Sequence, residues 1–166
     1  MKLWLSSNLL CRPSARKCNY PVWLVAGLLT FCLFFSCRTQ RTKEEVIKEI
    51  RDTEAAFNEV LLKQGVPYAF SRFADSLAVI KRGLNDTLLK GRSAILTYYS
   101  DPFYKNAKAY WKPDHIEVSG SLDMAYSYGH YTWLVTDSTG KESSYKGVYL
   151  TVWKRQPDNT WRYVWD

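Results

Sequence analysis

Few residues in this sequence are of a type that supports acid–base or metal chemistry. Its two histidines are His115 and His130, and neither has an acidic residue at the helical spacing of a metal site. His130 lies in an alternating run with Tyr126 and Tyr128, and a period of two places these three side chains on one strand face. His130 is therefore a weak candidate for a pocket acid or base. The alternative is a histidine held by structural hydrogen bonds.

Other catalytic signatures are missing from the sequence. All four cysteines, Cys11, Cys18, Cys32 and Cys37, lie within the first 37 residues, so the rest of the chain has no disulfide, thiolate nucleophile or cysteine metal ligand. No G-x-S-x-G or P-loop spacing occurs. We therefore expect no bound metal and no cofactor.

Two side chains near the C-terminal end stand where a pocket could use them. Tyr149 could donate a hydrogen bond to a ligand carbonyl, although a tyrosine on an aromatic strand face is also an ordinary core residue. Asp166 either ends near the mouth of a pocket or is simply exposed. The sequence leaves both questions open.

The first 37 residues have the pattern of an export signal. An apolar run of 14 residues, from Val22 to Phe35, follows a basic segment and is shorter than the roughly 20 residues of a bilayer-spanning helix. The run ends at Ser36-Cys37, four positions after Leu33, and so resembles the lipobox of bacterial lipoproteins. That resemblance implies a diacylated Cys37 and a mature protein in the cell envelope, on the periplasmic or outer-membrane face. Phe34-Phe35 departs from the lipobox pattern, and an uncleaved membrane anchor is the alternative.

We expect three segments: a signal peptide at 1–36, a tether at 37–42 and one folded domain at 43–166. The net charge is +7, with 23 basic and 16 acidic residues, but Lys2, Arg12, Arg16 and Lys17 all precede the apolar run. The rest of the chain has only a mild basic surplus. This balance, together with export from the cytoplasm, argues against nucleic-acid binding.

Three alternating runs rich in aromatic and β-branched residues predict an antiparallel meander at the C-terminal end. They span Met124–Thr136, Glu142–Trp153 and Thr160–Trp165, and turn-forming residues connect them. A further strand is expected at about 115–119. Pro113 limits any longer strand to a sheet edge or a bulge.

Three helices and a short hairpin are expected before these strands. Thr42 and Glu45 form a capping box that starts the first helix, and Gly65 ends it. Pro67 suits the first turn of the second helix, and residues 91–93 open the third. The hairpin, at 77–81 and 88–90, separates the second helix from the third. This order predicts an α+β fold whose helices cover one face of an antiparallel sheet.

Five short motifs, in this order, resemble the SnoaL-like domain of the nuclear transport factor 2-like superfamily. They are Phe73-Ala74-Asp75, 91–95, 124–131, 147–153 and Trp161-Arg162-Tyr163. The resemblance covers about Glu44 to Asp166 and is narrowest to a branch that is labelled a domain of unknown function. It implies a cone-shaped fold in which a curved antiparallel sheet wraps around three helices and an apolar pocket. It also implies a homodimer.

The superfamily contains ketosteroid isomerases, polyketide cyclases, dehydratases and non-catalytic binders, so the resemblance does not assign an activity. Isomerase-like members need a carboxylate base after the second helix and a tyrosine in the first. These positions fall at Lys81 and Phe57 here. A lysine must lose its charge before it accepts a proton, and a phenyl ring has no hydroxyl. The comparison favours a binder over an enzyme.

We therefore expect an exported, lipid-anchored protein whose pocket binds a small apolar or aromatic molecule. The predicted pocket residues are Phe57, Phe70, Tyr98, Tyr126, Tyr128, His130, Tyr149 and Trp153. One alternative is an isomerase-, cyclase- or dehydratase-type enzyme acting on a polyketide- or steroid-like carbonyl compound, and two acidic residues in the pocket would favour it. Another is a protein-interaction module. Both faces of the strand around Val148 are apolar while helices cover only one, so we expect a homodimer.

Overall fold

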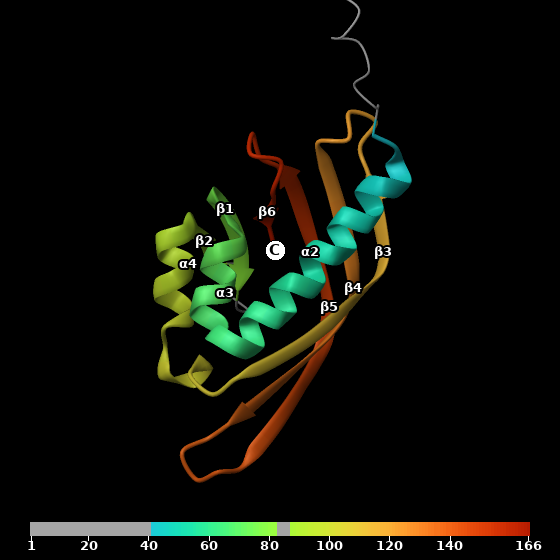
Figure 1. Cartoon of the computed structure of the whole chain (residues 1–166). Helices are drawn as coiled ribbons and strands as arrows, with labels where there is room; N and C mark the ends of the chain where they lie inside the picture. Colours follow the sequence, from blue (N-terminus) through green and yellow to red (C-terminus); the bar gives the residue numbers. More distant parts are fainter. Residues whose placement is uncertain (1–40, 83–86) are drawn as a thin grey trace, which may run out of the picture. The chain divides into compact units, whose positions relative to one another are not determined.

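The computed structural model describes residues 41–82 and 87–166 (Figure 1). Contacts make Arg41–Asp166 one compact unit. This unit has its own hydrophobic core and one sheet, which are the properties of an independently folding domain. The expected signal segment and Cys37 lie outside the described residues. In the described part of the chain, no helix is long and apolar enough to cross a bilayer.

The three helices lie close to where the sequence predicts them. Helix α2 spans Lys43–Gln64, and the Thr42 hydroxyl accepts a hydrogen bond from the Glu45 amide while the Thr42 amide donates to the Glu45 carboxylate. Gly65 ends α2 at a φ of 86°, a conformation that favours glycine. The other helical elements are α3 (Val66–Phe73), α4 (Arg92–Tyr99) and the short 3-10 helix η1 (Pro102–Tyr104).

In residues 41–82 and 87–166, six strands form one sheet. Their order across it is β2 (Thr87–Lys90), β1 (Ala74–Arg82), β6 (Trp161–Trp165), β5 (Glu142–Arg155), β4 (Met124–Thr136) and β3 (Lys108–Val118). Neighbouring strands are antiparallel except for β1 and β6, which are parallel. The sheet is therefore mixed and differs from the antiparallel expectation at this one junction. The reason is that the last strand of the meander pairs with β1, a long-range contact that no local pattern encodes.

Strand β3 is longer than the expected strand at 115–119. It starts at Lys108 and passes through Pro113, where its register with β4 shifts between Pro113 and His115. The strand lies at the sheet edge. Both conditions under which the sequence allows a proline in a longer strand are thus met, because an edge strand with a bulge tolerates a missing amide donor.

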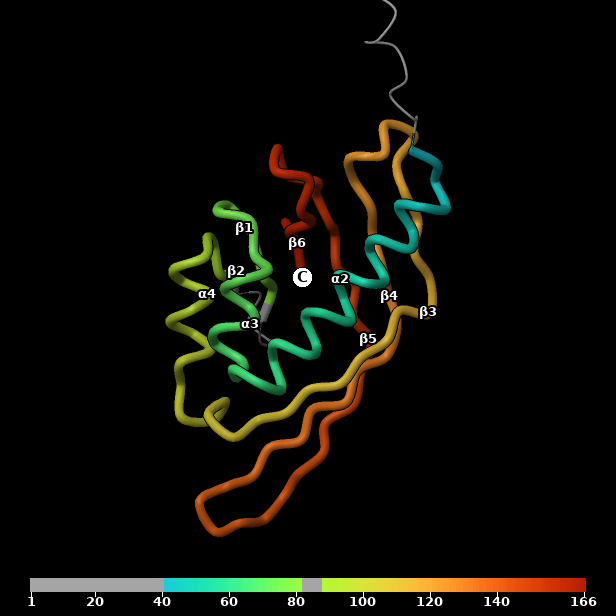
Figure 2. The backbone as a smooth tube through the Cα atoms, viewed as in Figure 1, coloured from blue at the N-terminus to red at the C-terminus, as the bar shows by residue number. Residues whose placement is uncertain are grey.

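The hydrophobic core lies between the helices and one face of the sheet. Figure 2 shows the three long strands β3, β4 and β5 bending together around α2. Helix α2 buries Val46, Ile50 and Phe57 against this face, and the sheet contributes Trp153 and Tyr163. The bend leaves room between the sheet and the helices, and this space holds the candidate site.

Candidate functional site

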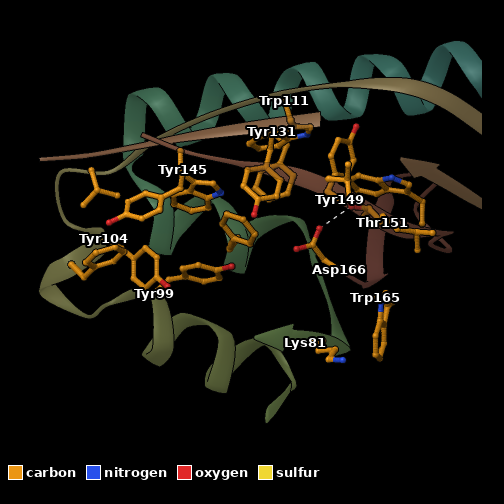
Figure 3. A pocket seen from close by; sticks show the side chains of 18 residues that line it. Lys81, Tyr99, Tyr104, Trp111, Tyr131, Tyr145, Tyr149, Thr151, Trp165 and Asp166 are labelled. Atoms are coloured by element: carbon orange, nitrogen blue, oxygen red, sulfur yellow. Dashed lines mark hydrogen bonds between the residues drawn. The ribbon is translucent and has the colours of Figure 1, made fainter. Parts of the chain in front are cut away.

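A cavity of about 490 Å³ lies between the sheet and the helices (Figure 3). Its size falls within the range of small-molecule sites in proteins. Twelve of its 18 lining side chains are aromatic: Phe57, Phe70, Tyr99, Phe103, Tyr104, Trp111, Tyr131, Trp133, Tyr145, Tyr149, Trp153 and Trp165. The polar and charged members that are not aromatic are few, namely Lys81, Thr151 and Asp166.

Alternation places aromatic side chains of one face of β4 and β5 in the cavity lining, namely Tyr131, Trp133, Tyr145, Tyr149 and Trp153. Tyr131 lies opposite Gly147 in the sheet, and Gly129 lies opposite Tyr149. A Cβ atom at Gly147 would meet the Tyr131 hydroxyl at 2.6 Å. The glycine therefore leaves room for the Tyr131 ring to lie across the neighbouring strand.

Four of the predicted pocket residues, Phe57, Phe70, Tyr149 and Trp153, line the cavity. Phe57 and Phe70 touch edge to face with ring centroids 5.0 Å apart, so they form one continuous aromatic wall. Tyr98 does not line it. Its hydroxyl accepts a hydrogen bond from the Tyr104 hydroxyl at 3.0 Å.

The other three predicted residues, Tyr126, Tyr128 and His130, share one strand face, as their spacing predicts, but this is the face turned away from the cavity. Tyr126 and Tyr128 are 39% and 44% exposed, and the His130 side chain is 78% exposed. Nδ1 of His130 lies 2.8 Å from a carboxylate oxygen of Asp114. Both faces of β4 carry aromatic residues, so alternation alone does not identify the inner one. The small residues Ala125, Ser127 and Gly129 occupy the inner face where the core packs against it.

One end of the cavity contains a carboxylate. The Thr151 hydroxyl donates to Oδ1 of Asp166 at 2.8 Å, and Figure 3 shows this carboxylate among the aromatic side chains. Strand β1 fixes its position, because the Asp166 amide donates to the Val79 carbonyl and the Lys81 amide donates to the Asp166 carbonyl, both at 3.1 Å. Lys81 lines the same end. The parallel β1–β6 junction therefore places Asp166 in the site.

A second carboxyl group lies behind the cavity wall. Glu54 of α2 is only 1% exposed, and its Oε2 accepts a hydrogen bond from the Tyr149 hydroxyl at 2.8 Å. Next to it, the Trp153 indole donates to the Ser127 hydroxyl at 3.0 Å. The Glu54–Tyr149 pair joins the helix layer to the sheet directly beside the cavity.

The surroundings of this pair favour its neutral forms. Burial raises the pKa of Glu54, and the negative charge of Asp166 acts in the same direction, while polar side chains including Ser127 oppose the shift. Burial also raises the pKa of the Tyr149 hydroxyl, and the adjacent Glu54 carboxyl raises it further. Tyr149 is therefore a hydrogen-bonding group and not a phenolate.

Glu54 is not among the residues predicted from the sequence, and for Asp166 the sequence allows both a pocket and an exposed position. Glu54 precedes Phe57, a predicted pocket residue, by three residues, and this spacing puts both side chains on one face of a helix. That signal was available. Asp166 depends on pairing with β1, which has no local signal. Across residues 41–82 and 87–166, no group of three or more histidine, cysteine and acidic residues is placed to hold a metal ion.

No protein-family model and no curated protein matches the sequence. Solved structures do match. A nuclear transport factor 2-like protein with a cystatin-like fold from Novosphingobium aromaticivorans is 20% identical, with a TM-score of 0.59 over 89% of this chain and 88% of its own. A nuclear transport factor 2-like superfamily protein from Salmonella enterica is 17% identical, with a TM-score of 0.61 over 75% and 89%.

A ketosteroid isomerase-like protein from Erwinia carotovora atroseptica is 14% identical, with a TM-score of 0.59 over 75% of this chain and 94% of its own. Structural matches at such low sequence identity establish a shared fold and not a shared activity. With three helices on a curved six-stranded sheet, the chain has the nuclear transport factor 2-like fold that its motifs predict.

Proposed function

We propose that this domain binds a small, mostly apolar molecule in its aromatic cavity and does so without turnover. The observation that carries the proposal is the lining, in which twelve aromatic side chains surround about 490 Å³. Such walls bury an aromatic or polycyclic ligand, and a few polar groups at one end orient it. Lys81 and Phe57 both line the cavity, where isomerase-type chemistry would need an acid and a tyrosine. This supports a binder.

The test is a fluorescence titration of residues 41–166 with the neutral probe N-phenyl-1-naphthylamine, followed by displacement with steroids and aromatic ketones. Tyr149→Phe should weaken displacement by ketones, because it removes a hydroxyl group from the cavity wall. Tyr128→Phe is the matched control, because it makes the same change on the outer face, where Tyr128 is exposed. Equal effects of the two variants, or no saturable binding, would contradict the proposal.

A second candidate function is an enzyme acting on a polyketide- or steroid-like carbonyl compound. The observation that favours it is the presence of two acidic residues at one end of the cavity, Asp166 in the lining and Glu54 behind Tyr149. In this reading Asp166 accepts a proton from the carbon beside a carbonyl. The test is an isomerase and dehydratase assay on wild type and Asp166→Asn, with the exposed Asp52→Asn as control. Turnover lost only in Asp166→Asn would replace the binder by the enzyme.

The proposal also places the protein in the bacterial cell envelope, held by lipid on Cys37. The apolar run that ends in Ser36-Cys37 supports it. Cys37→Ser should leave the precursor uncleaved and without lipid, as measured by intact mass. Residues before Cys37 in the mature wild-type protein would contradict this part of the proposal and favour an uncleaved anchor.

A further inference from the structure

Glu54 is the buried acidic residue of α2, and the proposed function gives it no role. Its Oε2 accepts from Tyr149, whereas its Oε1 has no hydrogen-bond partner among the described residues. Tyr149 and Trp153, which both contact Glu54, line the cavity. The carboxyl group is therefore one side chain away from whatever occupies the cavity.

The charge of an ionised Glu54 has little compensation. Within the described part of the chain, the ion pairs link other carboxylates to lysines and arginines and leave Glu54 without a cation. Tyr149 of β5 donates a hydrogen bond to Glu54, Asp166 after β6 adds a negative charge, and Asp114 of β3 acts on Tyr149 in the same direction. Lys81 of β1 is the cation of the cavity lining, at the end that holds Asp166. Ser127 of β4 and Trp153 of β5 add uncharged polar groups. Burial is the main cause that favours the protonated form of Glu54, and the negative charge of Asp166 adds to it.

We propose that the cavity binds an uncharged ligand together with one proton, and that Glu54 holds this proton. The inference rests on the proposed function and deepens it, because it selects neutral molecules as the ligand class. The physical reason is hydration: water in a ligand-free cavity lowers the cost of a charge just behind the wall. An apolar ligand displaces that water, so the ionised form of Glu54 becomes less favourable in the complex.

Linkage then fixes the direction of the pH dependence. If the ligand favours neutral Glu54, neutral Glu54 favours the ligand by the same free energy. Affinity is highest below the pKa of Glu54 in the ligand-free domain. It falls by up to about tenfold per pH unit as the pH rises toward the higher pKa in the complex, and it is constant above that.

The test measures the affinity of residues 41–166 for N-phenyl-1-naphthylamine across about pH 5 to pH 9. Wild type should bind more weakly as the pH rises. Glu54→Gln should bind with one affinity throughout, equal to that of wild type at low pH. Glu59→Gln is the control, because it makes the same change at an exposed position on the same helix, and it should follow wild type. A pH dependence that survives in Glu54→Gln, or a wild type that binds without any, would overturn the inference while leaving the proposed function standing.

A second measurement covers the case in which Glu54→Gln fails to fold. Carbon NMR of the wild-type domain with labelled glutamate carboxyl groups should show one group titrating above the usual glutamate range, and the probe should move its midpoint upward. No such group, or a midpoint that the probe leaves unchanged, would overturn the inference. The absence of saturable probe binding at every pH would instead contradict the proposed function, and this inference with it.

Discussion

Replacing Glu54 by glutamine should make the domain more stable at neutral pH. Burial raises the pKa of Glu54 above the ordinary value of 4.5, so the folded domain binds this proton more tightly than the unfolded chain does. The stabilising contribution of Glu54 is therefore complete below pH 4.5 and is lost as the pH rises through the folded-state pKa. Within that window wild type should lose about 1.4 kcal/mol per pH unit relative to the variant. Glutamine keeps an oxygen that accepts from Tyr149 and has no charge to bury.

The assay is urea unfolding followed by tryptophan fluorescence at a series of pH values, with the free energy of unfolding compared between the two proteins at each pH. Carboxylates whose pKa is lowered by hydrogen bonds, such as Asp75 and Asp137, also make the free energy of unfolding depend on pH. Their contributions are lost as the pH falls, but they are the same in both proteins and cancel in the difference. Glu59→Gln is the control and should not gain stability as the pH rises. A difference between wild type and Glu54→Gln that is constant with pH would show that Glu54 does not have a raised pKa in the folded domain.

Three further predictions concern the fold and its association. Thr42→Ala removes the side chain that caps α2, and it should cost about 1 kcal/mol in urea unfolding; an unchanged midpoint would contradict the cap. Phe57→Ala should lower the free energy of unfolding by about 3–5 kcal/mol, because Phe57 is 3% exposed among aromatic rings. Phe103→Ala, at a position that is 49% exposed, should lower it much less. Equal losses would place Phe57 outside the core. Val148 is 73% exposed on the outer sheet face, so we expect two copies of the domain to pair through this face. Sedimentation should show a homodimer for wild type and a monomer for Val148→Lys. A monomeric wild type at micromolar concentration would argue against this interface.

Local signals in the sequence were sufficient for most of the fold. The capping box at Thr42 and Glu45 marked the start of α2, and Gly65 marked its end, because caps satisfy backbone groups within one turn. Alternation marked β4 and β5 within a few residues. The parallel pairing of β1 with β6 and the N-terminal half of β3 were not predictable in this way. Both depend on partners distant in the sequence.

The site was only partly predictable, for a related reason. Phe57 was predicted to line the pocket, and Glu54, three residues before it, lies on the same face of α2, although a carboxylate is ordinarily assigned to the solvent face. For a strand with aromatic residues on both faces, such as β4, the period of two groups Tyr126 with His130 but does not say which group faces inward. Only the packing of α2 against small residues such as Ser127 decides that.

Locating a bound probe by NMR shows directly whether a small apolar molecule binds inside the cavity. With N-phenyl-1-naphthylamine bound to residues 41–166, nuclear Overhauser contacts should join probe protons to the rings of Tyr99 and Trp133, which line the cavity. Contacts only with the exposed outer-face rings of Tyr126 and Tyr128, or with no ring at all, would contradict binding inside the cavity.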